Sequence, residues 1–349
     1  MTAHTARNPA LAEAARLNRL VTEMKRANAD GKVTSAEKSS IVAHARQDEL
    51  AAQSLLPREG DGVVAELRHI QSLAKSGKLA LRVDPEIKAV IHERNAMWQQ
   101  AKNDAHSDPL KHMRHFKHPF HGVATRDFNW HGHKVSVVAV DLANPHVKLE
   151  TTGPGERGRH VEDFVKSHKA EVGINADFFT FGSFKPSGLN MKDGKPWGGK
   201  ADGFEDALVF RGQHAEIHPG LGHVPDWARN VVSSRHLVVE NGHAISQREL
   251  LRRHHVPSER DKVLEVKPRT SVGLSKDGRV LYLFAGMNMD EHTMGRLMAE
   301  HHVHLGFDMD SGGSAEMVRR RHGHTRVLQD GYGAGEHRHV ANAILIQSN

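Results

Sequence analysis

Apolar residues recur every three or four positions through the first hundred residues, which predicts amphipathic helices. Three such stripes precede residue 75, and a fourth follows Asp84-Pro85, a pair that supplies an N-cap and a first-turn proline. The stripes are Leu11, Ala14, Leu17, Val21 and Met24; Ile41, Val42 and Ala45; Val63, Leu67, Ile70 and Ala74; and Ile87, Val90, Ile91 and Met97. We therefore expect residues 1–102 to form a small all-α region.

The segment between the first two stripes also overlays a calcium-binding loop. Asn28, Asp30 and Glu37 fall at ligand positions and Gly31 at the required turn, but Arg26 stands where the first carboxylate is needed. A turn followed by a helix whose capping box ends at Glu37 explains the same residues. We favour that second interpretation.

Beyond Gly122 the apolar positions alternate, as they do in half-buried strands. The expected strands are 135–139, 146–151, 172–174, 207–210, 271–274, 280–285 and 341–346, and the expected helices are 161–168 and 294–301. Strands outnumber helices, and the Lys276-Asp277-Gly278 turn joins two of them as a hairpin. We predict an α+β domain with mixed β-sheets over residues 122–349, in preference to a doubly wound sheet.

The intervening residues 103–121 are rich in histidine and are expected to form a linker. His112, His115 and His118 would share one face of a helix, and three imidazoles can hold zinc. No carboxylate accompanies them and Pro119 would interrupt the helix, so we favour solvated histidines. No cofactor is assigned with certainty, and a bound divalent cation stays open.

The charge balance does not favour a nucleic-acid partner. The formal charge is +6 with 29 histidines counted as neutral, but lysine and arginine are interspersed with acids outside Arg319-Arg320-Arg321. Only 5% of the residues are aromatic, which leaves few rings to stack on bases. We interpret the basic residues as a solvated surface.

Cysteine is absent, which excludes disulfides, thiolate metal ligands and a cysteine nucleophile. No apolar run is long enough for a transmembrane helix, and the N-terminus lacks a Sec-type signal peptide. A cytoplasmic location and export by a non-standard route both stay open, as does the oligomeric state.

Two carboxylates end a short apolar strand near the C-terminus. Asp308 and Asp310 stand two residues apart, hence on one face of the strand, and Ser311-Gly312-Gly313-Ser314 follows them. Small residues after a strand let backbone N–H groups approach an anion. Ordinary turn chemistry explains an isolated acidic turn equally well.

Other strand ends carry compatible chemistry. Asn175 and Asp177 follow a short strand, Arg269 begins another, and Arg338 and Asn342 precede the last. Guanidinium groups suit bidentate phosphate recognition. Together with carboxylates they suit cleavage of a phosphorylated sugar, in which one acid protonates the leaving oxygen and another acts as base or nucleophile.

The order of these segments resembles the phosphodiester glycosidase family. The matching blocks are Asn175–Phe179, Arg269–Gly273, the helix near residues 294–301, Met309–Ser314 and Arg338–Ala343, within a span from Gly122 to Ile346. The resemblance implies the mixed-sheet domain of that family. It also implies a hydrolase that cleaves a glycosyl phosphodiester or related glycan linkage, with a sugar phosphate or glycan as its substrate.

By this resemblance a set of matched positions lines the site. They are Asn175, Arg269, Asp310, Gly312, Gly313, Ser314, Arg338 and Asn342. The chain departs from the family pattern at Asp177, which adds a carboxylate where the family has glycine. It departs again at Ser311, which replaces a glycine and narrows the backbone freedom of the turn.

We expect Asp310 to be the principal catalytic carboxylate, with Asp308 or Asp177 as its partner. Arg269 and Arg338 would hold the phosphate, or would form buried salt bridges to the same aspartates. Ser311 would join the matched positions in binding substrate, and Asn175 would orient the sugar or cap a turn.

Two other classes of function remain as alternatives. One is a metal-dependent phosphoesterase that uses histidines with Asp308 and Asp310. The other is a glycan-binding module that keeps the fold without catalysis.

Overall fold

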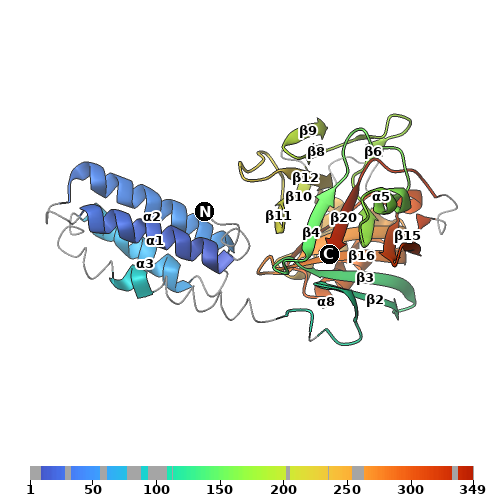
Figure 1. Ribbon diagram of the computed structural model, residues 1–349, viewed down its shortest axis with the longest axis horizontal. Coiled ribbons are helices and arrows are strands. Elements are labelled where there is room, and N and C mark those ends of the chain that lie inside the picture. The colour runs from blue at the N-terminus through green and yellow to red at the C-terminus, as the bar shows by residue number, and fades with distance from the viewer. Residues whose placement is uncertain are drawn as a thin grey trace. The chain divides into compact units, whose positions relative to one another are not determined.

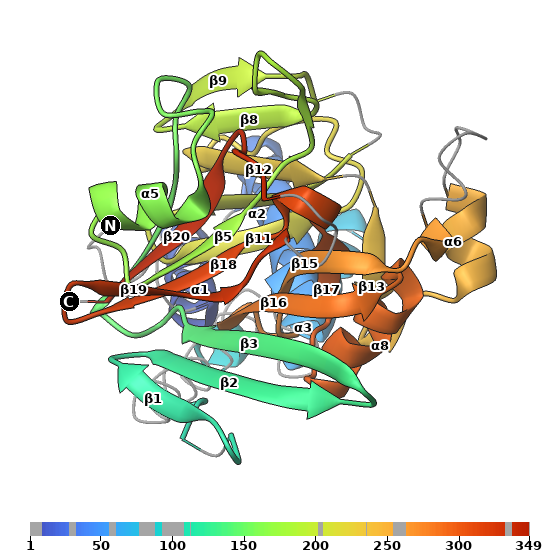
Figure 2. The same cartoon turned by 90° about the vertical axis from the view of Figure 1, so that its right-hand side faces the viewer.

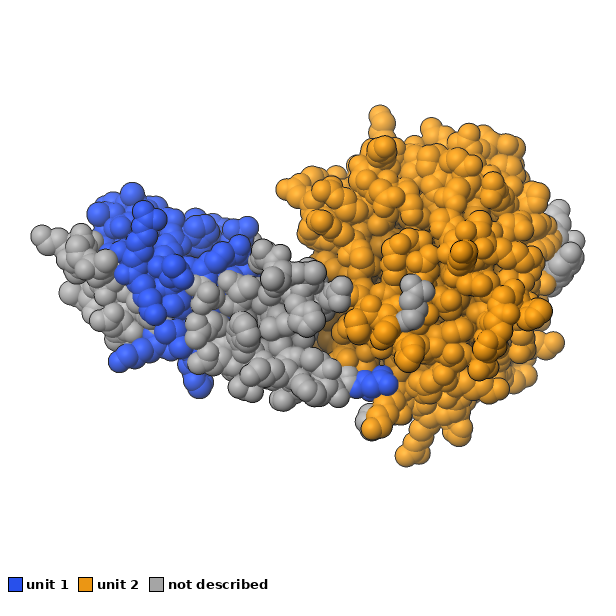
Figure 3. All heavy atoms as spheres, viewed as in Figure 1, with its two compact units in different colours: residues 1–108 blue, residues 109–349 orange. Residues whose placement is uncertain are grey.

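The computed structural model describes residues 9–27, 33–55, 61–76, 88–92, 108–111, 113–201, 205–234, 236–253, 263–331 and 337–348. The chain divides into two compact units, residues 1–108 and residues 109–349 (Figure 3). The first unit is helical and the second contains all the named strands (Figure 1).

The first unit packs helices around a small apolar core. Its helices are α1 (Pro9–Ala27), α2 (Ser35–Leu55) and α3 (Asp61–Lys75), and residues 88–92 are also helical. The buried side chains come from the predicted stripes and include Leu17, Met24, Ile41, Leu67 and Ile70. The rest of the predicted fourth helix lies outside the described residues.

A capping box begins α2, as the sequence predicts. The hydroxyl of Thr34 donates to Oε2 of Glu37 at 2.7 Å, and the backbone N–H of Glu37 donates back to that hydroxyl at 3.3 Å. Glu37 is thus occupied as a cap. Asn28, Asp30 and Gly31 of the calcium-loop alternative lie outside the described residues.

The second unit is built from one large sheet, two smaller sheets and a two-stranded ribbon. The large sheet has eight strands in the order β1-β2-β3-β16-β15-β17-β13-β14. These strands are β1 (Lys117–Phe120), β2 (Val123–Trp130), β3 (His133–Asp141), β13 (Leu237–Glu240), β14 (His243–Ala244), β15 (Lys267–Leu274), β16 (Val280–Met289) and β17 (Leu305–Asp308). Strands β15 and β16 form the expected hairpin, with Val272 opposite Leu283.

The two smaller sheets have five strands each. One runs β11-β10-β12-β8-β9 and the other β19-β18-β5-β20-β4. Their strands are β4 (Val147–Thr151), β5 (Val172–Asn175), β8 (Leu189–Lys192), β9 (Lys195–Gly198), β10 (Asp206–Arg211), β11 (His214–His218), β12 (Asn230–Ser234), β18 (Met317–Arg321), β19 (His324–Gln329) and β20 (Ala343–Ser348). The ribbon pairs β6 (Phe179–Thr180) with β7 (Lys185–Pro186).

Helices cover the sheets from outside. Helix α5 (Val161–Ser167) packs its buried Val161, Phe164 and Val165 against the sheet that contains β5, β18 and β20 (Figure 2). Helix α8 (Glu291–Glu300) begins where Asp290 accepts a hydrogen bond from the N–H of Thr293 at 2.7 Å, and it packs on the large sheet. A third short helix is α6 (Gln247–Arg253).

Each expected strand and helix of this unit is present, with ends shifted by a few residues. The α+β class is confirmed, but the mixed pairing is wrong for the described strands, whose named pairings are all antiparallel. The central pairs β2·β3 and β15·β16 are hairpins, and a tight turn can join only antiparallel neighbours.

The histidine-rich residues 103–121, which were predicted to form a linker, contain a β-strand. Strand β1 falls within it and pairs with β2 at the edge of the large sheet, a position that tolerates Pro119. His118 lies in β1, and His115 has a positive φ of 65°, so the shared helical face predicted for them is wrong. His112 lies outside the described residues.

Among the described helices, none has the length and apolar character needed to cross a bilayer.

Candidate active site

The predicted site residues meet where strands of two sheets end. The backbone N–H of Asp310 donates to the carbonyl of Ala176 at 2.9 Å, and that of Met309 donates to Thr270 at 2.8 Å. The N–H of Ala176 in turn donates to the carbonyl of Asn342 at 3.2 Å. These bonds join the ends of β5 and β17 to β15 and to the segment before β20, so residues far apart in the sequence share one location.

Arg269 and Asp308 form a buried ion pair within this junction. The side chain of Arg269 is 1% exposed, and its Nη1 donates to Oδ2 of Asp308. Its Nε donates to the carbonyl of Met289 at 2.9 Å and its Nη2 to that of Glu265 at 3.0 Å. The hydroxyl of Ser271 donates to Oδ1 of Asp308 at 2.7 Å. This geometry favours the salt-bridge interpretation of Arg269 over phosphate binding.

The pKa of Asp308 reflects opposing effects. Burial raises the pKa of this carboxyl, while the charge of Arg269 and the hydrogen bond from Ser271 lower it. With both oxygens occupied inside the protein, Asp308 is suited to support the site.

Asn175 organises the backbone of the acidic turn. Its side chain is fully buried, and its Nδ2 donates to the carbonyl of Asp310 at 2.7 Å. Its Oδ1 accepts from the hydroxyl of Thr270 at 2.8 Å and from the N–H of Glu316 at 3.0 Å. The amide is therefore occupied by the protein, an arrangement suited to fixing Asp310 in place.

Asp177 and Asn342 form a second buried polar cluster. Oδ1 of Asp177 accepts from the N–H and the hydroxyl of Ser233, each at 3.0 Å, and Oδ2 accepts from Nδ2 of Asn342 at 2.6 Å. Oδ1 of Asn342 accepts from the N–H of Asp177 at 3.0 Å. Burial raises the pKa of Asp177 to about 7, although these donors oppose the rise. Asp177, where the family pattern has glycine, thus forms reciprocal hydrogen bonds with Asn342 inside the protein.

Asp310 differs from both neighbouring aspartates because it is partly exposed. Its Oδ1 accepts from the N–H of Ser311 at 2.9 Å. Burial of the carboxyl raises its pKa to about 6, against the lowering effects of Ser314, the Ser311 N–H and the charges of Lys267 and Arg338. A carboxyl with such a pKa changes its protonation state near neutral pH, as proton-transfer groups do.

Two cations lie near Asp310, and an exposed ring lies beside one of them. Lys267 and Arg338 both lie near enough for their charges to lower its pKa, and the guanidinium carbon of Arg338 lies 5.2 Å from the centroid of the Phe181 ring. Phe181 is 69% exposed. Neither Lys267 nor Phe181 is among the site residues that the sequence predicts. The signals available were a basic residue two positions before Arg269 and a third aromatic after Phe178-Phe179.

The turn after Asp310 has one position that requires glycine. Gly312 has a φ of +67°, whereas Ser311 has a φ of −129° in the extended region that any residue adopts. Replacement of a glycine by Ser311 therefore introduces no backbone strain. Ser311, Gly312, Gly313 and Ser314 are all buried, and the carbonyl of Gly313 accepts from the N–H of Arg338 at 2.9 Å.

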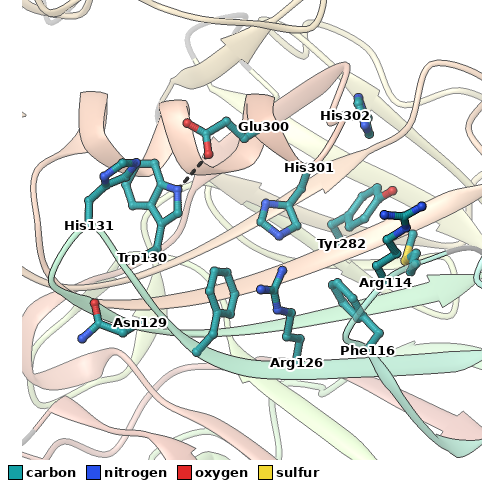
Figure 4. Close-up of a pocket in the computed structure, with 12 residues that line it drawn as sticks. Arg114, Phe116, Arg126, Asn129, Trp130, His131, Tyr282, Glu300, His301 and His302 are labelled. Atoms are coloured by element: carbon teal, nitrogen blue, oxygen red, sulfur yellow. Dashed lines mark hydrogen bonds between the residues drawn. The ribbon is translucent and has the colours of Figure 1, made fainter.

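A separate cavity of about 620 Å³ lies on the large sheet (Figure 4). Its walls combine aromatic rings with cations, and Nε1 of Trp130 donates to Oε2 of Glu300 at 2.8 Å beside it. The lining residues are Met113, Arg114, Phe116, Arg126, Phe128, Asn129, Trp130, His131, Tyr282, Glu300, His301 and His302. None of the predicted site residues is among them, so this cavity carries no part of the chemistry at Asp310.

One group of described side chains has the spacing needed to hold a metal ion. It consists of His160, Glu316 and His337 and includes neither Asp308 nor Asp310. The metal-dependent alternative in the form predicted, with histidines beside those two aspartates, has no counterpart among the described residues.

The chain belongs to the phosphodiester glycosidase family. The sequence profile of that family matches residues 168–347, which contain all five ordered blocks, the helix α8 among them. This confirms the predicted family. No curated protein matches the chain.

One solved structure shares the fold at low sequence identity, and two others align less well. The zebrafish N-acetylglucosamine-1-phosphodiester alpha-N-acetylglucosaminidase catalytic domain, auto-inhibited by its pro-peptide, aligns with a TM-score of 0.52 and 16% identity over 68% of this chain and 85% of that one. A hypothetical protein from Synechocystis aligns with a TM-score of 0.47 and 12% identity, over 65% of this chain and 62% of that one. A putative exported protein from Burkholderia pseudomallei aligns with a TM-score of 0.42 and 13% identity, over 62% of this chain and 74% of that one.

Proposed function

We propose that this chain is a hydrolase that cleaves a glycosyl phosphodiester or a related glycan linkage, with Asp310 as the reacting carboxylate. The observation that carries the proposal is the setting of Asp310. It is the partly exposed member of three neighbouring aspartates, has a pKa raised to about 6, and is flanked by Lys267 and Arg338. Membership of the phosphodiester glycosidase family supports the same class of substrate.

The chemistry assigned to these groups follows from their charges. Water attacks the anomeric carbon, the bond from that carbon to the phosphate oxygen breaks, and the phosphate monoester leaves as an anion. Lys267 and Arg338 stabilise the negative charge of that leaving group. Asp310, in its ionised form, accepts the proton of the attacking water.

The leaving group decides between the two roles open to Asp310. A phosphate monoester held by two cations is a stable anion and gains little from protonation. Deprotonation of water is the more demanding step, and a carboxylate whose pKa is about 6 is a stronger base than an ordinary aspartate. Asp310 therefore serves as the base.

The other predicted residues hold Asp310 in position. Asn175 binds its carbonyl, and the Arg269–Asp308 pair anchors the strand that precedes it. Asp177 and Asn342 link the end of β5 to the segment before β20. The exposed ring of Phe181 offers an apolar face for the sugar beside Arg338.

A panel of glycosyl-1-phosphodiesters tests this proposal. We expect the wild-type chain to release free sugar and phosphate monoester from at least one member, and Asp310→Asn to lower kcat/KM by about 10²–10⁴-fold. Asp226→Asn makes the same change at an exposed aspartate and should leave the rate unaltered. Equal rates for wild type and Asp310→Asn, or no hydrolysis of any member, would contradict the proposal; binding without hydrolysis would favour the glycan-binding alternative.

A further inference from the structure

Two histidines and a glutamate converge beside the proposed active site. One ligand atom from each of His160, Glu316 and His337 lies within 4.8 Å of the other two. They come from separate segments, since His160 precedes α5, Glu316 precedes β18 and His337 lies in the segment before β20. Three ligand side chains at this spacing match the protein contribution to a zinc site with an open position.

The glutamate is held rigidly inside the protein. Glu316 is 0% exposed, and its Oε2 accepts from the N–H of Val161 at 2.7 Å while Oε1 accepts from that of Glu162 at 3.2 Å. Oε2 also lies 3.2 Å from Nε2 of His337. A buried carboxylate whose orientation is fixed by backbone donors resembles the hydrogen-bonded carboxylates that ligate metals.

The imidazole rings pack against one another beside this carboxylate. The rings of His160 and His337 are stacked with centroids 4.2 Å apart, and His339 approaches His160 edge-on at 4.3 Å. Nδ1 of His160 is buried and makes no hydrogen bond to any described residue. A buried nitrogen without a partner costs stability unless a ligand occupies it.

Backbone hydrogen bonds hold the residues that follow His337. Arg159 pairs with Val340, whose N–H donates to the Arg159 carbonyl at 2.8 Å, so the residues before β20 lie alongside His160. Arg338 lies between His337 and His339, and its N–H binds the carbonyl of Gly313. A ligand held by His160 and His337 would therefore fix the backbone that presents Arg338.

We propose that His160, Glu316 and His337 bind one divalent transition-metal ion, and that this ion positions Arg338 at the site of Asp310. Two imidazole nitrogens and one carboxylate oxygen are ligands that Zn²⁺ accepts readily, whereas Mg²⁺ and Ca²⁺ prefer oxygen alone. The fourth ligand is water or the neighbouring His339. The ion has a positioning role, so substrate binding depends on it more than the chemical step does. Only this positioning role rests on the proposed function, and the metal site itself does not.

Co²⁺ is a suitable probe because it substitutes for zinc and absorbs visible light when its coordination is four- or five-fold. The purified full chain, freed of metal by a chelator, is titrated with Co²⁺ alone. We expect one equivalent to give a saturable visible spectrum that is lost in His160→Ala and His337→Ala. His324→Ala removes an exposed histidine of β19 and serves as the matched control, which should retain the spectrum.

The chain has 29 histidines and no cysteine, so any competing Co²⁺ binding would come from other histidines. Weak surface binding would give several equivalents and would persist in both variants, and that result would overturn the proposal. His160→Gln and His337→Gln keep the polarity and size of the side chain, so they repeat the test if an alanine variant fails to fold. A wild-type chain that binds no Co²⁺ would also overturn it.

The positioning role has its own measurement. Removal of the metal from the wild-type chain should raise KM for a hydrolysed glycosyl phosphodiester about tenfold with little change in kcat, and Zn²⁺ should reverse the effect. Complete loss of kcat on chelation would contradict positioning and indicate a metal that acts on the reacting atoms. Because the Co²⁺ titration needs no substrate, it stands whether or not the hydrolysis is found.

Discussion

Asp308 and Asp310 stand two residues apart at the end of β17, yet their surroundings differ. The carboxylate of Asp308 is enclosed by Arg269 and Ser271 and has both oxygens occupied. Asp310 is partly exposed, has cations nearby, and has its backbone rather than its carboxylate held by Asn175. A shared strand face therefore does not imply a shared role, because the role depends on what each carboxylate contacts.

The largest expected effect separates the two aspartates by stability. Asp308→Asn removes the nearer of two described carboxylates beside the buried Arg269 and leaves Glu291, whose Oε1 lies 3.5 Å from Nη1. We expect this change to lower the free energy of unfolding by about 3 kcal/mol. The same substitution at Asp310 breaks no ion pair inside the protein and should have a much smaller effect. Urea unfolding of both variants at neutral pH measures the difference. Similar losses for the two would show that the contrast is false.

The second effect is the pH dependence of stability. The pKa of Asp310 is about 6 in the folded chain against an ordinary value of 3.8. The folded state therefore binds the proton of Asp310 more tightly than the unfolded state does. The stability that this protonation contributes is present in full below about pH 4 and is lost as pH rises through about 6. We expect the unfolding free energy of wild type to fall relative to that of Asp310→Asn by about 2 kcal/mol between pH 4 and pH 7. A constant difference across that range would refute the raised pKa.

The third effect concerns the cations near Asp310. Lys267→Met and Arg338→Met each remove a charge that would bind the phosphate, and we expect each to raise KM about tenfold, equivalent to about 1.4 kcal/mol. Lys276→Met, at an exposed turn, is the control and should change nothing. Steady-state kinetics on a hydrolysed substrate give the answer. Unchanged KM in both variants would remove these residues from the site.

An effect of similar size is expected in the turn itself. Gly312→Ala places a side chain at a φ of +67° and should cost about 1–2 kcal/mol of stability, although the nearest atom to an added Cβ, Cδ of Lys267, is 3.8 Å away. Ser311→Ala, at a φ of −129°, keeps an allowed backbone and should cost less. Thermal unfolding of the pair tests whether backbone conformation, rather than space, selects glycine here. Equal losses of stability in the two variants would show that backbone conformation does not select glycine at position 312.

The sequence predicted the strands of the second unit because their apolar positions alternate or run unbroken. Strand β16, for example, has an apolar run from Val280 to Ala285 that is buried along its length. The same pattern did not predict β1, because Lys117–Phe120 contains a lysine, a histidine and a proline, a composition typical of a linker. Only pairing with β2 at a sheet edge makes that segment a strand.

The sequence predicted which of these residues come together better than it predicted what each of them contacts. Ordered blocks located Asn175, Arg269 and Asp310 together, but nothing local to Arg269 reveals that its partner is Asp308, 39 positions away. In the sequence Lys267 resembles a solvated lysine, and only the folded chain shows that its charge acts on Asp310.

The sequence likewise did not predict the group of His160, Glu316 and His337. These residues are spread over more than half of the second unit, with no ligand spacing between them. Only the folded arrangement brings their side chains together.

The dependence of kcat/KM on pH tests the role of Asp310 most directly. If this carboxylate is the base, kcat/KM rises with pH and reaches half of its maximum near pH 6, where the pKa of Asp310 lies. Asp310→Asn should lose this rising limb along with most of its rate, whereas Asp226→Asn should retain both. A rate that falls as pH increases through 6 would make Asp310 an acid, and a rising limb retained in Asp310→Asn would assign the base to another residue.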